Sequence, residues 1–395
     1  MSCVIFGAGK IARGFIGHLL FLSNIPFVFV EKSQALVDLI NERGSYTVNI
    51  LGNPSQNCVV GPVRAIGYDD KEAIADAVAG ADAVFHAVGG KNLKEIIPSL
   101  ASGVEEKSKR GGFLNIVACE NWKKPADIVR EGIEGLLTAD AADYFRENAG
   151  VTEAVILRSA IEPEAEQLKA DPLIVNVQDY WELHVDQSRL KGKLPEITGL
   201  HLIQEFGGFL ERKFYTYNAA NGSLSYLGAL LGYEILAEAA HDERILEILE
   251  GVYSETARAL CAKYGMDLKE QMEFTRGSLA KLQNYVIVDK IERNARDPLR
   301  KLGPDDRLVG SARLVEEYGI VPENLCTAIA AAIYYTNESD PSAVQLREMR
   351  SKKGVDYILE NVCGLDPSGS MACVIREKIE LLKKKGLISE GREER

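Results

Sequence analysis

The sequence is poor in residues arranged to hold a metal ion or to form disulfides. Its seven cysteines are scattered and odd in number, and no two of them form a C-x-x-C pair. This usage is typical of buried thiols in a reducing compartment. The five histidines are isolated, and no H-E-x-x-H pattern occurs among them. Since zinc needs clustered Cys and His ligands, we expect no metal site.

Long apolar runs and an excess of positive charge are also lacking. No stretch reaches the roughly 18 to 20 uninterrupted apolar residues that span a bilayer, and the chain enters an expected strand at once rather than a signal peptide. We therefore expect a cytoplasmic protein with no membrane association. The formal net charge is -12, whereas nucleic-acid binding relies on clustered Lys and Arg. No nucleic-acid partner is expected, and an anionic small-molecule substrate would need a local basic pocket.

The 395 residues suit two domains, each able to bury its own apolar core. In the first half, short β-branched or aromatic runs (3–6, 27–30, 83–88 and 113–118) alternate with amphipathic helical segments, which is typical of a parallel sheet covered on both faces. Later, apolar residues recur at helical intervals over 223–239, 242–264, 268–287 and 323–336. We expect a Rossmann-type, doubly wound α/β domain over 1–190 and a mainly α-helical domain over 191–395.

The first 31 residues contain a complete dinucleotide-binding pattern. The expected strand leads into Phe6-Gly7-Ala8-Gly9-Lys10-Ile11, where the first glycine permits a tight turn and the second lets the backbone approach a pyrophosphate. The start of the following helix supplies N–H donors and the positive end of the helix dipole. Glu31 directly follows the next strand, where a carboxylate binds the ribose hydroxyls and repels a 2′-phosphate. The cofactor expected is NAD rather than NADP, although the adjacent Lys32 weakens this preference.

A further glycine pair follows the strand expected to end near residue 88. Val88-Gly89-Gly90 offers another close backbone approach, beside the nicotinamide ribose of the cofactor. An ordinary turn is the alternative interpretation of the same residues.

A hydride-transferring enzyme also needs a group that exchanges a proton with the substrate oxygen. None of the fifteen tyrosines has a lysine four residues later, so a tyrosine base of the Y-x-x-x-K type is absent. Lys213 is the candidate base, because its aromatic neighbours could desolvate it and lower its pKa. On one continuous α-helix Lys213 and Asn218 would diverge by about 140°. The Asn and Gly content of 218–223 predicts a break that would turn both side chains toward one pocket.

The chain resembles the polyol-specific long-chain dehydrogenases, the mannitol dehydrogenase family, nearly from end to end. The residues that carry the resemblance are 6–17, Ser45-Tyr46-Thr47-Val48, Cys119-Glu120-Asn121, Glu211-Arg212-Lys213, and 298–302 with 306–308. The resemblance implies that Lys213 is the general acid and base and that Asn218 and Asn121 form an oxyanion-binding pair. This sequence departs from the family pattern at Asn221, where the family has a histidine. An asparagine can still form hydrogen bonds, but it cannot gain or lose a proton near neutral pH as a histidine does.

The segment 293–301 and Arg307 form the best candidate for binding a phosphate, because guanidinium groups suit that anion. Resemblance to the phosphate-specific branch of the family favours Arg300 and Lys301 as the contacts. The alternative is a surface loop whose bases are neutralised internally by its aspartates (Asp297, Asp305 and Asp306).

Taken together, these features imply reversible, NAD-linked oxidation of D-mannitol 1-phosphate to D-fructose 6-phosphate. Two alternatives remain at this point: an oxidoreductase acting on a related, non-phosphorylated polyol or hexuronate, and a dinucleotide-binding sensor without activity, suggested by Asn221. The family resemblance suggests a monomer, and no heptad pattern argues otherwise.

Overall fold

The computed structural model describes residues 1–388 and divides into two compact units, Met1–Phe206 and Gly207–Arg395. The sequence-based boundary at residue 190 differs from this division. The reason is β12 (Leu200–Ile203), which pairs in parallel with β11 (Leu183–Asp186) and so belongs to the first unit. Each unit is described by itself below.

The first unit is built on an eight-stranded sheet with the order β12-β11-β8-β7-β6-β1-β2-β5. Its strands are parallel except where β11 meets β8. The carboxyl ends of its central strands therefore meet at one edge, which is where open sheets of this kind bind ligands. The remaining bounds are β1 (Cys3–Phe6), β2 (Phe27–Glu31), β5 (Ala65–Gly67), β6 (Ala83–His86), β7 (Leu114–Ala118) and β8 (Ala149–Val155).

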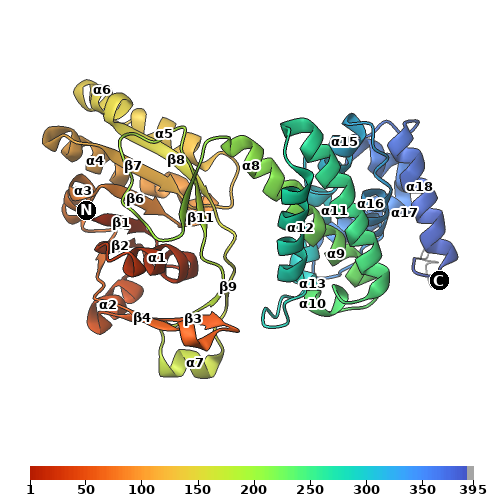
Figure 1. Cartoon of the computed structure of the whole chain (residues 1–395), viewed down its shortest axis with the longest axis horizontal. Coiled ribbons are helices and arrows are strands. Elements are labelled where there is room, and N and C mark those ends of the chain that lie inside the picture. The colour runs from red at the N-terminus through yellow and green to blue at the C-terminus, as the bar shows by residue number, and fades with distance from the viewer. Residues whose placement is uncertain (389–395) are drawn as a thin grey trace. The chain divides into compact units, whose positions relative to one another are not determined.

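Both faces of this sheet are buried, because successive side chains of a strand point to opposite faces. Along β1, Ile5 enters one apolar core and Phe6 enters the other. One face is covered by α3 to α6, and the other by α1 with a four-stranded sheet of order β4-β3-β10-β9 (Figure 1). The bounds are η1 (Ala12–Gly17), α1 (His18–Leu22), α2 (Gln34–Arg43), β3 (Tyr46–Leu51), β4 (Cys58–Val60), α3 (Lys71–Gly80), α4 (Leu93–Arg110), α5 (Pro125–Glu134), α6 (Ala139–Asn148), β9 (Ala160–Ile161), α7 (Ala165–Ala170) and β10 (Val175–Gln178).

The second unit is helical as far as the structure describes it. Three helices at its centre, α9 (Ala219–Leu230), α11 (Glu243–Tyr264) and α16 (Glu323–Ile333), pack against one another around side chains such as Leu224, Val252 and Ile329 (Figure 1). The predicted fold class, an α/β domain followed by a mainly helical one, is confirmed. The other bounds are α8 (Phe206–Lys213), η4 (Phe214–Asn218), α10 (Leu236–Ala239), α12 (Leu268–Leu282), α13 (Ile291–Ala295), α14 (Pro298–Lys301), α15 (Val309–Glu317), α17 (Pro341–Asn361) and α18 (Ser370–Lys384).

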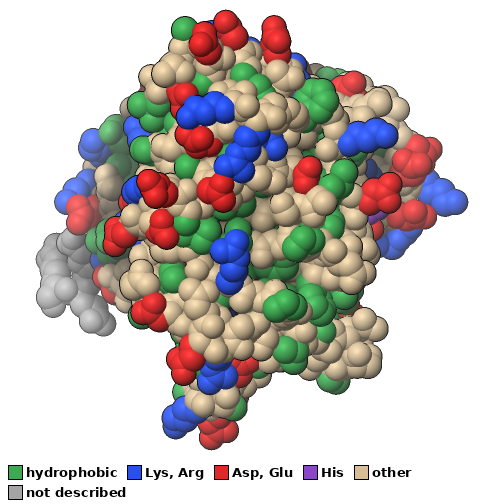
Figure 2. Space-filling view, turned by 90° about the vertical axis from the view of Figure 1, so that its left-hand side faces the viewer, with side chains coloured by type: hydrophobic (Ala, Val, Ile, Leu, Met, Phe, Trp, Pro, Cys, Tyr) green, Lys and Arg blue, Asp and Glu red, His purple; other side chains and the backbone are tan. Residues whose placement is uncertain are grey.

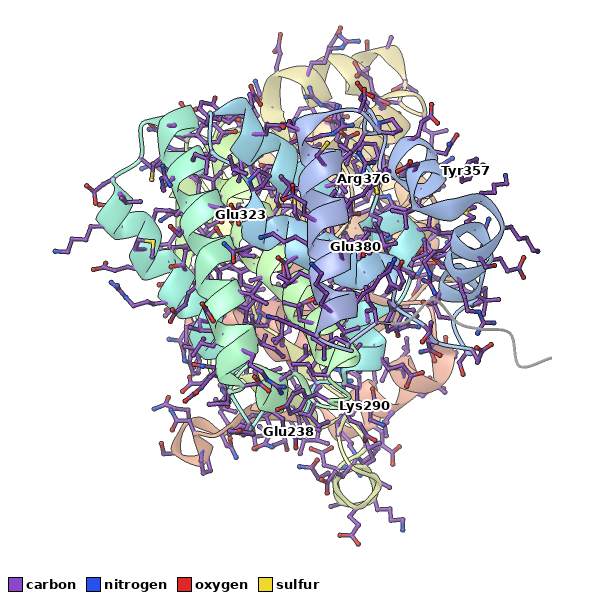
Figure 3. The ribbon with its side chains drawn as sticks, turned by 90° about the vertical axis from the view of Figure 1, so that its right-hand side faces the viewer. Glu238, Lys290, Glu323, Tyr357, Arg376 and Glu380 are labelled. Atoms are coloured by element: carbon purple, nitrogen blue, oxygen red, sulfur yellow. The ribbon has the colours of Figure 1, made fainter. Side chains whose placement is uncertain are left out.

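Ion pairs join α18 to two neighbouring helices of this unit. Arg376 of α18 pairs with Asp356 of α17 at 2.7 Å, and Lys378 pairs with Glu323 at the start of α16 at 2.8 Å. Figure 3 shows Arg376 and Glu380 on α18. These contacts hold α18 over the core that positions α9.

The surface carries charges of both signs. On the face shown in Figure 2, basic and acidic side chains are interspersed with scattered apolar ones. Among residues 1–388, no helix has the length and apolar character needed to cross a membrane. In the same range, no group of three or more His, Cys, Asp or Glu side chains is placed to hold a metal ion.

Candidate active site

The glycine loop makes a tight turn after β1 and leaves part of its backbone uncovered. Gly7 follows β1 with φ of 88°, and a Cβ atom there would lie 2.7 Å from the carbonyl oxygen of Ala87. Both observations favour glycine, because only glycine adopts positive φ at no steric cost. A Cβ at Gly9 would meet nothing within 4 Å, so its backbone is open to an approaching pyrophosphate. The helix that begins after Gly9 directs its N–H donors toward the same space.

The other residues predicted in this loop are placed in different ways. Phe6 is fully buried and offers the site only its backbone, whereas Ile11 is half-buried. The Lys10 ammonium is paired with the Glu162 carboxylate. The Ala8 N–H donates to Glu31, which ties the loop to the end of β2.

Glu31 is held by the backbone at the carboxyl end of β2. Its carboxylate accepts the N–H groups of Ala8 at 2.7 Å and Ser33 at 2.9 Å. Lys32 points its charge elsewhere and pairs with Glu95 at 2.7 Å. The lysine is therefore neutralised by an acidic partner, and the net local charge at the end of β2 is that of Glu31. A negative charge here is the arrangement that the sequence-based preference for NAD over NADP requires.

The loop after β6 is organised by a carboxylate that sequence reasoning did not single out. Glu120, just beyond β7, accepts the N–H of Val88 at 2.7 Å and that of Gly89 at 3.1 Å. Its carboxylate also lies 3.3 Å from Nδ1 of His86, a fully buried side chain of β6. Asn121 follows at the same edge of the sheet and is exposed. The only sequence signal for Glu120 is its place beside Asn121 in the family motif.

The helix that carries Lys213 is continuous, so the expected break at 218–223 is wrong. Between α8 and α9 the chain forms one π-helical turn, η4, in which the Ala219 N–H donates to the Phe214 carbonyl. Lys213, Asn218 and Ala219 all keep helical φ and ψ. In a π-helix, bonds join residues five apart, so each turn holds more residues than an α-helical turn and Lys213 and Asn218 diverge by less than on an ordinary α-helix. The widened turn thus brings the two positions toward the same side without interrupting the helix, and Asn221 follows three residues later.

Buried polar contacts hold the π-helical turn in place. Thr216 is fully buried, and its hydroxyl accepts a hydrogen bond from Nε2 of Gln271 at 3.0 Å. The side-chain oxygen of Gln271, Oε1, in turn accepts a hydrogen bond from Nε of Arg212 at 2.6 Å. The Arg212 guanidinium lies 4.3 Å from the ring centroid of Phe274. These contacts leave the buried polar groups beside the turn paired, and Thr216 and Gln271 were not predicted from the sequence.

Lys213 lies in a half-buried, positively charged environment. Burial lowers the pKa of Lys213 to about 8, and the charge of Arg307 adds to this shift. Arg307 packs beside the π-helical turn: its Cδ would be 3.0 Å from a Cβ at Gly222, and its guanidinium lies 5.9 Å from the Phe214 ring centroid. Burial, followed by the charge of Lys213, lowers the pKa of Lys281 to about 8. Within residues 1–388, no carboxylate pairs with Lys213.

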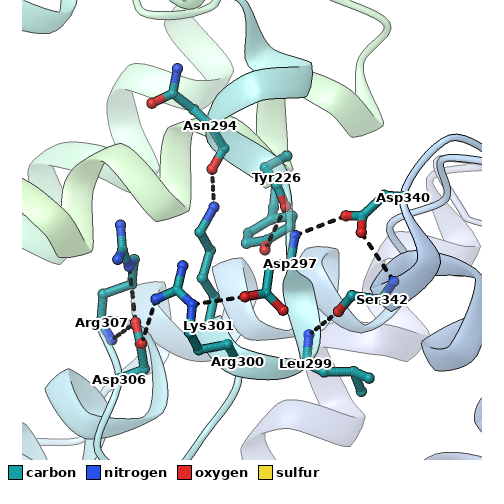
Figure 4. Close-up of polar contacts among 11 residues, drawn as sticks. Tyr226, Asn294, Asp297, Leu299, Arg300, Lys301, Asp306, Arg307, Asp340 and Ser342 are labelled. Atoms are coloured by element: carbon teal, nitrogen blue, oxygen red, sulfur yellow. Dashed lines mark hydrogen bonds and ion pairs between the residues drawn. The ribbon is translucent and has the colours of Figure 1, made fainter. Parts of the chain in front are cut away.

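The predicted phosphate contacts are partly engaged by the protein itself. Arg300 donates from Nε to Asp297 at 2.8 Å and from Nη1 to Asp306 at 3.0 Å (Figure 4). Lys301 is buried and donates to the backbone carbonyl of Asn294. Burial and the nearby arginine charges lower the pKa of Lys301 to about 7. The internal neutralisation considered as the alternative thus exists for Arg300, through two of the three aspartates.

Comparisons with known proteins agree with the two-unit structure. Residues 1–199 match the model of the mannitol dehydrogenase Rossmann domain, and residues 206–380 match that of the mannitol dehydrogenase C-terminal domain. The chain is 35% identical over 372 residues to a mannitol-1-phosphate 5-dehydrogenase of Bacillus pumilus (strain SAFR-032), covering 94% of this chain and 97% of the relative.

Two solved structures share the fold at low sequence identity. A D-sorbitol dehydrogenase in substrate-free form has a TM-score of 0.81 at 17% identity and covers 98% of this chain and 94% of its own. A ternary complex of Pseudomonas fluorescens mannitol 2-dehydrogenase with NAD and D-mannitol has a TM-score of 0.71 at 14% identity, with coverage of 98% and 92%.

Proposed function

The chain belongs to the mannitol dehydrogenase family, and on this premise we propose that it reversibly oxidises D-mannitol 1-phosphate to D-fructose 6-phosphate, with Lys213 as general acid and base. It is an NAD-dependent polyol dehydrogenase. The observation that carries the assignment of Lys213 is its lowered pKa, about 8, on the side of the helix toward which the widened turn brings Asn218. A base near this pKa exchanges protons efficiently at neutral to mildly alkaline pH.

In the oxidation direction, neutral Lys213 takes the proton of the reacting hydroxyl as its carbon becomes a carbonyl. NAD, when bound, supplies the acceptor for the hydride that leaves the same carbon. The Asn218 amide, one π-helical turn from Lys213, donates a hydrogen bond to the reacting oxygen and stabilises its developing negative charge. Asn121 stays the predicted second donor, and this role rests on the family resemblance. In the reverse direction the Lys213 ammonium returns the proton to the ketose oxygen.

The cofactor side of the proposal rests on the first unit. The pyrophosphate is assigned to the loop Gly7-Ala8-Gly9 and the helix start at Lys10 and Ile11, and the adenosine ribose to Glu31. The backbone of Val88 and Gly89, fixed by Glu120, is assigned to the nicotinamide ribose. These assignments follow from the open backbone at Gly9 and the carboxylate at the end of β2.

Several cations in the second unit support a phosphorylated substrate. Lys213, Lys281 and Lys301 all have lowered pKa values in a chain of net charge -12, so an anion arriving here would stabilise their charged forms. Arg300 and Lys301 stay the predicted contacts. Arg307 is a further contact, because within residues 1–388 its side chain hydrogen-bonds only through Nε, to Asp306, which leaves both Nη groups for a phosphate.

The test is a substrate panel with NADH as reductant: fructose 6-phosphate, fructose and tagaturonate. We expect turnover of fructose 6-phosphate alone at low concentration. In Arg307→Met its KM should rise about 10- to 100-fold, since a charge-assisted hydrogen bond contributes roughly 1.5 to 3 kcal/mol. Equal rates with fructose would defeat the phosphate assignment.

One observation favours a second candidate, an oxidoreductase for a non-phosphorylated polyol or hexuronate. Arg300 already directs two of its donors to Asp297 and Asp306, as a cation without a phosphate partner would. The same panel separates the two. The alternative of a sensor without activity is tested with the wild-type protein and with Lys213→Ala. We expect Lys213→Ala to lose turnover and to keep its affinity for NADH. A wild-type protein that binds NADH but reduces no ketose would instead support the sensor.

A further inference from the structure

Asn221 is the first member of a chain of side-chain amides that ends at a carboxylate. Its Nδ2 donates to Oδ1 of Asn294 at 3.2 Å. Nδ2 of Asn294 donates to the Asp289 carboxylate at 2.7 Å and to the backbone carbonyl of Lys290 at 3.0 Å. Asp289 is also held by Arg293, through Nε at 2.9 Å and Nη2 at 2.8 Å. All of these groups belong to the second unit.

The carboxylate fixes the direction of every hydrogen bond in this chain. An ionised carboxylate and a backbone carbonyl can only accept, so Asn294 must turn its NH2 group toward Asp289. Its oxygen is then left to face Asn221, which must donate from its own NH2 group. The Oδ1 of Asn221 consequently points away from this chain, and within residues 1–388 it accepts no hydrogen bond. The amide of Asn221 is therefore an oriented acceptor.

The backbone of Asn294 is anchored as well as its side chain. Its carbonyl accepts from the Lys301 ammonium, and the next carbonyl, that of Ala295, accepts from the Tyr226 hydroxyl at 2.9 Å (Figure 4). Tyr226 lies on α9, the helix that begins just before Asn221. The segment that carries Asn294 is thus anchored to α14 through Lys301 and to α9 through Tyr226, which keeps Asn294 opposite Asn221.

We propose that Asn294, oriented by Asp289, is a positioning residue that acts through Asn221 and presents its Oδ1 as an acceptor for a hydroxyl of the substrate. This inference rests on the proposed function, because Asn221 shares the helix surface of Lys213 and Asn218. Side chains three residues apart are neighbours on an α-helix, which places Asn221 next to Asn218. An amide acceptor favours substrates that carry a hydroxyl at one particular position, and it does not change its protonation state with pH.

The experiment compares KM and kcat for the ketose that the wild-type enzyme reduces, in the variants that follow. Asn294→Leu removes the partner of Asn221 at similar volume and leaves Asp289 paired with Arg293. The double variant Asp289→Asn with Asn294→Asp rebuilds part of the chain: the amide introduced at position 289 donates to a carboxylate at position 294 that still accepts from Asn221, but the donor to the Lys290 carbonyl is lost. Asn221→Ala, alone and combined with Asn294→Leu, removes the acceptor itself. Asn361→Leu, at an exposed amide on α17 that donates to the Tyr357 carbonyl, makes the same substitution as Asn294→Leu and is the control.

We expect Asn294→Leu and Asn221→Ala each to raise the KM for the ketose about tenfold, with kcat and the KM for NADH changed by less than about threefold. The double variant should recover part of the loss, and Asn294→Leu should add nothing to Asn221→Ala. Additive effects, an unchanged KM in Asn294→Leu, or equal changes in the KM for NADH would overturn the inference. If Asn294→Leu does not fold, the KM for the ketose is compared between the double variant and the same double variant combined with Asn221→Ala. A wild-type enzyme that reduces fructose instead of fructose 6-phosphate would defeat the phosphate assignment alone, and the same comparison then proceeds with fructose.

Discussion

The surroundings of Lys213 predict the pH dependence of both reaction directions. Burial, followed by the charge of Arg307, lowers the pKa of Lys213 to about 8. On the proposed function, oxidation needs the neutral amine, so its kcat/KM should rise as the pH increases through about 8 and level off above it. Reduction needs the ammonium, so its kcat/KM should be highest below pH 8 and fall above it. Arg307→Met removes a like charge, so the pKa of Lys213 should rise and both transitions should move to higher pH.

The size of this shift follows from the order of its causes. At pH 7 a lysine with a pKa of about 8 is neutral in about one molecule in ten, against about one in 3000 at its ordinary pKa of 10.5. Burial is the larger cause of the decrease, so Arg307 accounts for less than half of it. Its removal should therefore move the transitions upward by about 1 pH unit or less.

The assay is kcat/KM for the polyol and for the ketose between about pH 6 and 10, because kcat/KM reports the pKa values of the free enzyme, whereas kcat reports those of the complex with substrate. Arg276→Met removes the same charge from an exposed position on α12 and serves as the control. Its transitions should stay where the wild-type enzyme has them. A transition that stays in place or moves downward in Arg307→Met would refute the electrostatic reasoning.

Three further predictions concern the loop, the ribose site and the π-helical turn. Gly7→Ala brings a Cβ to 2.7 Å from the Ala87 carbonyl at positive φ, so fluorescence titration should show NADH affinity reduced at least about tenfold; wild-type affinity would contradict the loop assignment. Glu31→Ala should raise the KM for NAD about tenfold or more and weaken discrimination against NADP, and a KM unchanged for both cofactors would count against the ribose role. Gln271→Met leaves Thr216 without its partner, which should lower the free energy of unfolding in urea by about 1 to 3 kcal/mol and also lower kcat. Wild-type stability and kcat together would show that this contact does not hold the turn.

The first unit could be predicted well because its signals are local. The strand before Gly7 and the strand before Glu31 were both predicted, and each is recognisable within a few residues. The boundary was harder, because β12 has only four residues and their burial does not follow the sequence alternation: Leu202 is exposed, and only the two end residues are partly buried. Its place in the sheet is decided by pairing with β11, which depends on the three-dimensional fold.

For the candidate site, the sequence indicates residue types but not their geometry. The family motif points to Lys213 and Asn218, whose roles stay predictions, yet nothing in those residues predicts a π-helical turn, and the buried contact beside it joins Thr216 to a glutamine 55 positions away. The role of Glu120 was missed for the same reason. Its partners, His86 and Gly89, come from the neighbouring strand and its loop, and no local pattern marks a carboxylate as the group that orders another loop.

The distribution of charge in the second unit links binding of the substrate to the chemistry. Arg300 is neutralised by Asp297 and Asp306. In contrast, the positive charge of Arg307 acts on the pKa of Lys213, and the positive charge of Lys213 acts on the pKa of Lys281. On the proposed function, a phosphate dianion bound at Arg307 offsets the charge that lowers the pKa of Lys213, so that pKa rises when the substrate binds. Ketose reduction requires Lys213 to carry a proton, and the phosphate of the ketose helps it to do so. The free enzyme therefore keeps a lysine that loses its proton readily, and the substrate itself prepares that lysine for the reductive direction.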